Sequence, residues 1–280
     1  MRSVSHDNYD LMRRRHQFQL ESSVELGTLQ QLAVSVIVTA YKDHREEWIK
    51  SMPCIPKKIR QEICKRLMYK GDLDNELFSL CVDVDRNVWD LRTIRGNFTS
   101  ESCAVLSQCK SLELLRLSYP SCSSAALTNM LKNFTQLRLL EVTNTEEMND
   151  SVIEAVASSC PHLEVLNVKG TAVTNQGMLT IANLQLKLSE LDISRTNISR
   201  EGVDFLKSGP MKETLKLLRF NRCEMLGSAK TIRDIVLSFS NLKDYSFDFI
   251  EGEDEAEIND ALNQLPGPTP GQNVFFNIPL

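Results

Sequence analysis

A short apolar pattern recurs six times in the second half of the chain. Each copy has leucine or another apolar residue at its first, fourth and sixth positions, with mostly polar residues between them. The copies begin at Leu112, Leu137, Leu163, Leu188, Leu215 and Leu242, so successive copies are 25, 26, 25, 27 and 27 residues apart. A fixed period of about 20–50 residues is typical of a solenoid, in which neighbouring repeats share one continuous apolar core.

Each copy predicts one strand, one turn and one helix. The residues three places after the sixth position lie in the turn, and they are Pro120, Thr145, Thr171, Thr196, Cys223 and Ile250. A small hydroxyl or thiol there is expected to turn inward and bond the backbone of the bend, because an unpaired buried backbone group costs about 1–3 kcal/mol. Helix-period apolar residues follow, for example over 152–157 and 178–182. A seventh, degenerate copy is expected to open the array at Val88.

Residues 149–168 resemble the cysteine-containing leucine-rich repeats, which occur mainly in substrate receptors of ubiquitin ligases. The repeat length fits this class, whose period is about 20–29 residues. The resemblance covers about residues 85–250. Strand plus helix in every repeat predicts an α/β fold, a horseshoe-shaped solenoid of about six to seven repeats with a parallel sheet inside. An N-terminal α-helical box is expected before it. Repeats of this kind also serve as plain scaffolds, so the fold alone does not assign a function.

The N-terminal third predicts three helices. Thr28 and Gln31 form a capping box, and the apolar residues that follow up to Ala40 lie on a single helical stripe. Pro56 suits the first position of a second helix, on which Ile55, Ile59, Ile63 and Leu67 recur at four-residue intervals. A third helix is expected over 75–81 and joins the first repeat.

The first two helices resemble the paired motifs of the VHL-type box in elongin–cullin ubiquitin ligases. The resemblance implies elongin-C contacts by a threonine, a leucine, a small residue and an apolar residue, here Thr28, Leu29, Ala33 and Ile37. It implies cullin contacts by the residues similar to the cullin-2 box, here Ile55, Pro56, Ile59 and Ile63. Ala33 stands where cysteine is commoner in the family, and it keeps the small side chain that the elongin pocket needs.

A VHL-type box before leucine-rich repeats looks like the Zyg eleven family of substrate receptors. Those proteins continue into an armadillo-like domain that captures substrate. No such domain is found in the sequence up to Leu280, so the family's recognition of glycine-starting degrons is not carried over. The resemblance implies a non-catalytic receptor with elongin C/B and a cullin as partners. Two alternatives stay open. The 55–89 segment also resembles an F-box, which binds Skp-type adaptors, and residues 21–84 also suit a plain helical cap on a ligase-independent scaffold.

The open face of the repeats is the expected substrate surface. Residues at the third and fifth strand positions point from the concave sheet, and Arg222 follows one of the strands. The candidates are Leu114, Arg116, Leu139, Glu141, Val165, Asn167, Leu217, Arg219 and Arg222. Four of them form an apolar column, and solvent-facing leucines in a row tend to mark a contact surface. Arg219 and Arg222, together with Arg195, are candidates for binding an acidic peptide.

Composition narrows the class of protein. The chain has 280 residues, of which 42% are hydrophobic and 25% charged, as in ordinary soluble domains. A net charge of −5 gives no general attraction to nucleic acid or anionic membranes. The eight cysteines form no C-x-x-C pair and no secretion signal precedes them, which favours reduced thiols in the cytoplasm or nucleus. We find no catalytic constellation, P-loop or zinc spacing, and therefore expect no enzyme activity, cofactor or metal.

These patterns divide the chain into four parts. A polar tail over 1–20, with Arg13–Arg15 inside it, is expected to be disordered. The helical box and cap over 21–84 precede the repeats over 85–250. An acidic segment opens the last part, 251–280, whose apolar end is expected to fold back as a C-terminal cap on the last repeat. A short linear binding motif is the alternative for that end.

Overall fold

The computed structural model describes residues 28–94, 98–223, 228–248 and 275–277. Their centre is one parallel sheet with the strand order β1-β2-β3-β5-β7-β8-β9-β10. The strands are β1 (Val88–Asp90), β2 (Leu114–Ser118), β3 (Leu139–Thr143), β5 (Val165–Asn167), β7 (Glu190–Asp192), β8 (Leu217–Arg219), β9 (Asp244–Asp248) and β10 (Phe275–Asn277). Consecutive repeats therefore lie side by side, as a solenoid requires.

The register of the sheet confirms the repeat alignment. Leu114 pairs with Leu139, Leu139 with Val165, and Glu190 with Leu217, so residues at the same repeat position meet. Val88 pairs with Leu114, which confirms the degenerate first copy. The chain is thus an α/β leucine-rich-repeat solenoid. Residues 1–20 and 251–274 lie outside the described residues, while Phe275–Asn277 pairs with β9 at the end of the sheet.

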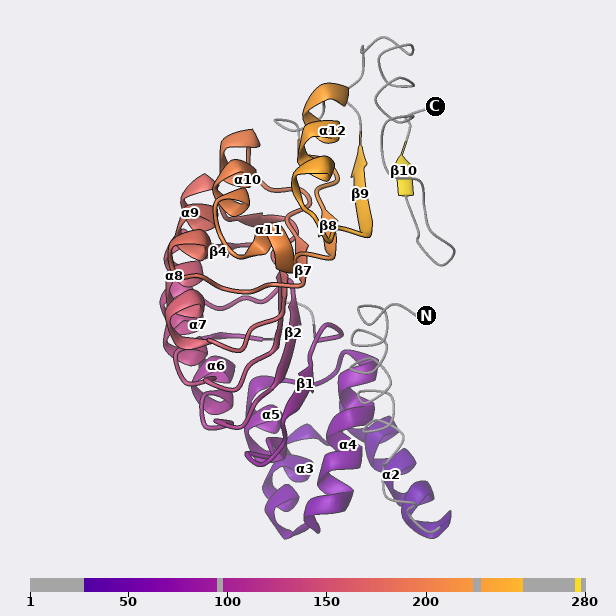
Figure 1. Cartoon of the computed structure of the whole chain (residues 1–280). Helices are drawn as coiled ribbons and strands as arrows, with labels where there is room; N and C mark the ends of the chain where they lie inside the picture. Colours follow the sequence, from indigo (N-terminus) through magenta and orange to yellow (C-terminus); the bar gives the residue numbers. More distant parts are fainter. Residues whose placement is uncertain (1–27, 95–97, 224–227, 249–274, 278–280) are drawn as a thin grey trace.

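Helices cover the convex side of this sheet (Figure 1). They are α6 (Ser100–Leu106), α7 (Ser124–Leu131), α8 (Asp150–Ser159), α9 (Asn175–Asn183), α10 (Arg200–Lys207), the short α11 (Met211–Thr214) and α12 (Ala229–Ser238). A second, two-stranded parallel sheet, made by β4 (Thr145–Asn149) and β6 (Thr171–Ala172), lies between the strands and helices of two central repeats. Each repeat therefore supplies one strand to the concave side and one helix to the convex side.

The core lies between these two layers. The inward positions of the copies that begin at Leu112, Leu137, Leu163, Leu188 and Leu215 are all buried. Two of the turn threonines behave as expected: Thr171 Oγ1 donates to the Val168 carbonyl and Thr196 Oγ1 to the Ile193 carbonyl, both at 2.6 Å. The Cys223 thiol also donates to Ile193, at 3.2 Å. Thr145 differs, because it is half-buried and its Oγ1 accepts from the Glu147 N–H at 3.3 Å. Ile250 lies outside the described residues.

In the central repeats, the start of one helix is bonded to the start of the next. Asp150, the first residue of α8, accepts from the backbone N–H of Thr174 at 2.8 Å and from its hydroxyl at 2.6 Å. Gly177 leaves room for this carboxylate, since a Cβ there would come within 2.6 Å of it. One repeat later, Asn175 accepts from the N–H of Ser199 at 2.9 Å. Side chains of one repeat thus satisfy the free helical N–H groups of its neighbour.

Replacing Asp150 with alanine is expected to lower the free energy of unfolding by about 1–3 kcal/mol, because two hydrogen bonds to a charged group are lost and the Thr174 N–H is left unpaired. Glu154, on the same helix and exposed, is the matched control, and its replacement by alanine should change the unfolding free energy by less than about 0.5 kcal/mol. Urea unfolding of both variants measures the difference. Equal stability of the two variants would contradict the role given to Asp150.

Among the described residues, which begin at Thr28, five elements precede the solenoid. They are α2 (Thr28–Ala40), α3 (Arg45–Ser51), the 3-10 helix η1 (Met52–Cys54), α4 (Lys57–Lys70) and α5 (Asn75–Cys81). The helices from Thr28 and over 75–81 are confirmed. Pro56 lies one residue before α4, as its N-cap, and the sequence analysis did not predict α3.

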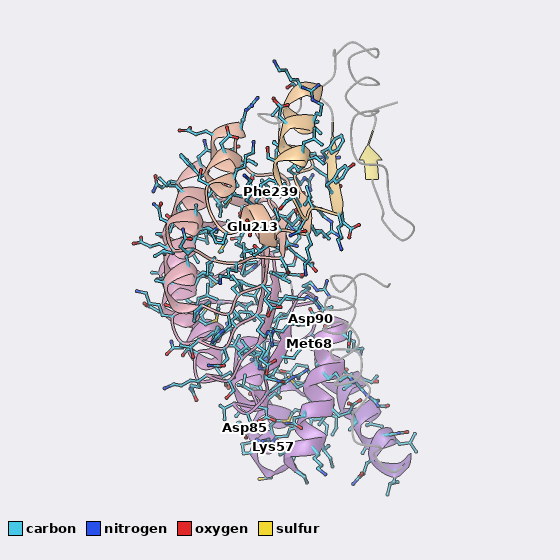
Figure 2. The ribbon with its side chains drawn as sticks, in the orientation of Figure 1. Lys57, Met68, Asp85, Asp90, Glu213 and Phe239 are labelled. Atoms are coloured by element: carbon cyan, nitrogen blue, oxygen red, sulfur yellow. The ribbon has the colours of Figure 1, made fainter. Side chains whose placement is uncertain are left out.

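The N-terminal helices share the apolar core of the repeats. Phe78 of α5 packs edge-to-face on Trp89 of β1, with ring centroids 5.7 Å apart, and on Phe98 at 6.1 Å. At the start of α4, Lys57 Nζ lies 2.9 Å from the Asp83 carboxylate and 3.9 Å from that of Asp85, just before β1 (Figure 2). Helices and solenoid are therefore one packed body.

Candidate interaction surfaces

Helix α2 has two apolar faces, and only one of them is buried. Val34 and Val38 lie in the core, as does Tyr41 directly after the helix. On the other face, Leu29 is 81% exposed, Leu32 60% and Val36 65%, and Ala33 between them is exposed as well. Residues at i, i+3, i+4 and i+7 lie in one row on a helix, so these four side chains form a continuous apolar row, here called the α2 stripe.

The rest of the molecule holds α2 in place and leaves the stripe outward. Arg66 of α4 donates to the Ser35 hydroxyl at 2.7 Å, and Lys70 donates to the Val38 carbonyl at 3.2 Å. Lys42, just after the helix, pairs with Asp72 at 2.8 Å. In Figure 1, α2 lies at the outer margin of the N-terminal helices, beside α4. The stripe is therefore an exposed apolar surface on a fixed helix.

The structure divides the residues proposed for elongin C between the two faces. Leu29 and Ala33 are exposed on the stripe, whereas Ile37 is half-buried and packs against the core. Thr28 begins the helix, and its side chain lies outside what the structure describes. Leu32 and Val36 belong to the predicted apolar stripe but were not singled out as contacts, because the family pattern does not include them.

The residues proposed for the cullin lie just before α4 and on it. Pro56 is exposed, and Ile55 and Ile59 are half-buried against the core. Ile63 is 0% exposed, so the expectation that it lies on the same contact surface is wrong. The reason is helical geometry: a step of four residues turns about 400°, so each step shifts the side chain by about 40°. From Ile59 to Ile63 this rotation carries the row into the core.

The apolar column on the concave side is also buried, which corrects the expectation of solvent-facing leucines. Leu114, Leu139 and Val165 join Val88 in a separate apolar cluster, while Leu217 is half-buried. Neighbouring strands lie about 4.7–4.9 Å apart, so side chains at equal positions contact each other across the strands. In the first four strands the column therefore packs against itself.

Arg116 and Glu141, proposed as substrate contacts, belong to a buried ionic network. Arg116 Nε lies 3.2 Å from Glu141 Oε2, and its Nη1 lies 3.6 Å from Asp90 Oδ2. Arg92 pairs with the same Asp90 carboxylate at 2.6 Å, at the end of β1 (Figure 2). Both proposed residues are nearly inaccessible to solvent. Their charges are balanced within the protein, so they are poor candidates for binding a partner.

The later repeats leave the remaining candidates accessible. Asn167 and Arg219 are half-buried and Arg222 is exposed. Arg195 and Arg222 both have a positive φ, 57° and 54°, at the position where Gly170 and Asn144 stand in earlier repeats. A left-handed backbone costs arginine about 1–2 kcal/mol but costs glycine little. Arg195 and Arg222 are thus exposed to solvent and adopt a backbone conformation that the intrinsic preference of arginine does not explain.

Glu190 and Asp192 stand at the third and fifth strand positions of their repeat, one strand from Arg219, and were not selected as site residues. Glu190 is 6% exposed and Asp192 is 8% exposed. Burial raises the pKa of Glu190 to about 7, although Arg219 acts in the opposite direction. The sequence contained a signal for this site: Glu190 stands at the third strand position, where neighbouring repeats have the apolar residues Val165 and Leu217.

The cysteines contribute packing. All are free, and each except Cys54 is buried. Burial raises the pKa of the Cys160 thiol to about 12, which keeps it protonated at neutral pH. Among the described residues, no group of histidine, cysteine and acidic side chains is arranged to hold a metal ion. In the same part of the chain, no helix has the length and apolar content to cross a bilayer.

Comparison with known proteins supports the repeat. A family model described as "Leucine Rich repeat" matches residues 159–182, within the central repeats. No curated protein matches the chain.

Three solved structures resemble the fold. The actin-binding site 2 of leiomodin-1 matches at 15% identity, 49% of this chain, 86% of that chain and a TM-score of 0.38. A chain of the Rad7 and Elc1 complex from yeast matches at 13% identity, 91% of this chain, 98% of that chain and a TM-score of 0.34. An internalin of Listeria monocytogenes matches at 16% identity, 75% of this chain, 57% of that chain and a TM-score of 0.43. At these scores the likenesses carry no argument about function.

Proposed function

We propose that this leucine-rich-repeat protein is the non-catalytic substrate receptor of an elongin–cullin ubiquitin ligase, with α2 as the helix that docks on elongin C. The observation that supports this most is the exposure of the α2 stripe. Leu29 and Ala33, which the VHL-type pattern assigns to the adaptor, lie on it, and the opposite face of the same helix is anchored in the core. A free apolar row on a rigid helix is suited to docking in an apolar groove.

The stripe supplies a large part of the free energy that docking requires. Burying one leucine or valine side chain completely is worth about 1.5–3 kcal/mol. Leu29, Leu32 and Val36 together therefore contribute roughly 5–9 kcal/mol before the cost of association is subtracted. Further contacts would come from Pro56, Ile55 and Ile59, which we propose as the cullin-binding residues. Ile63 is excluded from that set because it is buried.

In this proposal the concave face of the later repeats binds the protein to be ubiquitinated. Leu217, Arg219 and Arg222 are accessible there, whereas the first strands are closed by their own apolar and ionic contacts. Free buried thiols suit a reducing compartment, so we place the complex in the cytoplasm or nucleus.

A second candidate function is binding of a Skp-type adaptor by an F-box-like surface. Partly exposed Ile55, Pro56 and Ile59 before and on α4 favour it. This alternative makes no use of the α2 stripe, and it leaves three large apolar side chains in water without a role.

Co-purification with each adaptor separates the two functions. The purified chain is passed over immobilised elongin B/C and, in parallel, over an immobilised Skp-type adaptor. We expect retention on elongin B/C alone. Retention on the Skp-type adaptor alone would support the F-box alternative, and retention on neither would leave a scaffold that acts outside ubiquitin ligases.

A further inference from the structure

The concave face of the last repeats carries carboxylates on two of its strands. The register aligns Glu190 of β7 with Leu217 of β8 and Asp244 of β9, and it aligns Asp192 with Arg219 and Ser246. Leu191, between the two acidic residues of β7, points into the core, so Glu190 and Asp192 share the concave side. This surface is far from α2 along the solenoid (Figure 1), so binding of a ligand here does not depend on adaptor binding.

Glu190 is more than nine-tenths buried, and its carboxylate makes no hydrogen bond or ion pair with another of the residues that the structure describes, although its oxygens keep some contact with solvent. Asp192 differs, because its Oδ1 accepts from the Ser194 N–H at 3.0 Å. A carboxylate that is mostly removed from water and has no partner within the protein is costly. The cost would be relieved if a cation from another molecule reached this carboxylate.

The charges around Glu190 define the site. Burial raises its pKa to about 7; Arg219 and Lys216 act to lower the pKa, and Asp244 and Glu141 act to raise it. The charge of Glu141 is already balanced by Arg116, so Asp244 is the neighbouring carboxylate that, with Glu190, favours a positive ligand over a negative one. Arg219, on the strand between β7 and β9, is the internal cation that competes with such a ligand.

We propose that the concave surface of β7, β8 and β9 binds a lysine or arginine side chain of a protein partner, which pairs with Glu190 and is flanked by Asp192 and Asp244. Glu190 and Asp244 stand two strand spacings apart, about 9–10 Å between backbones, which is wide for one small metal ion. An arginine fork with five donors, on a long apolar stem, suits this spacing and the neighbouring Leu217.

Fluorescence anisotropy with a labelled tetra-arginine peptide tests the site at pH 8. We expect the wild-type chain to bind it, Glu190→Gln to weaken binding at least tenfold, and Arg219→Gln to strengthen it. Glu154→Gln, which removes the same charge from the exposed side of α8, is the control and should bind as the wild type does. A thermal melt of each variant confirms that it is folded.

The pH dependence gives an independent readout. Below pH 7 the Glu190 carboxyl takes up a proton, so the affinity of the wild type should fall from pH 8 to pH 6, and Glu190→Gln should lose most of this dependence. Wild-type binding by Glu190→Gln would overturn the proposal. Weaker tetra-arginine binding by Arg219→Gln, or preferential binding of a tetra-glutamate peptide, would overturn it as well and would assign the face to acidic segments.

Discussion

Replacing Leu29 with aspartate is expected to abolish binding to elongin B/C while leaving the stability of the chain unchanged. Leu29 is 81% exposed, so the substitution removes almost no internal contact. In a complex the same position would be enclosed by the apolar pocket of the adaptor, and an unpaired charge cannot be buried there without a cost of several kcal/mol. We expect the affinity to fall by at least a hundredfold, which isothermal titration calorimetry measures directly.

Leu237 provides the matched control for this substitution. It lies on α12 at the opposite end of the solenoid and is 54% exposed, so Leu237→Asp introduces the same charge on a surface that has no role in adaptor binding. Its affinity for elongin B/C should equal that of the wild type. Unchanged binding by Leu29→Asp, or an equal loss in both variants, would show that the α2 stripe is not the docking site.

Replacing Leu140 with alanine is expected to lower the free energy of unfolding by about 2–5 kcal/mol. The side chain is fully buried, so the substitution loses the transfer free energy of the removed atoms and also creates a cavity. Leu140 lies on β3 in the middle of the array and packs between neighbouring repeats. Since domains are stable by about 5–15 kcal/mol, this single change removes a large share of the total. Urea unfolding followed by circular dichroism provides the measurement.

The exposed Leu184 gives the comparison for the core substitution. Its side chain is 45% exposed, so Leu184→Ala should lower the unfolding free energy by less than about 1 kcal/mol. If Leu140→Ala unfolded at the same urea concentration as Leu184→Ala, the continuous core between repeats would be contradicted.

The repeats were predictable because their signal is periodic and local. Leucines at the first, fourth and sixth positions fix which side of each strand faces the core, and the parallel register follows from equal spacing. Thr171 and Thr196 were predictable as well, since a bend leaves a backbone carbonyl that a small hydroxyl can reach. In the N-terminal region, the capping box at Thr28 identified the start of α2.

What the sequence did not reveal depends on packing between elements. Ile63 fits the contact pattern of α4 in one dimension, but the angle of the helix against the core decides that it is buried. The pairing of Arg116 with Glu141 arises only when β2 and β3 lie side by side. Whether Glu190 is partnered likewise depends on side chains from neighbouring strands, so its importance emerged only from the structure.

Hydrogen–deuterium exchange of the chain with and without elongin B/C tests the central claim most directly. Docking through the α2 stripe should slow the exchange of backbone amides in residues 28–40, with smaller protection at 55–59 and none in the later repeats. Protection confined to 55–67 would indicate an F-box-like interface. Unchanged exchange in 28–40 at saturating adaptor would contradict the assignment of α2 as the recruiting helix.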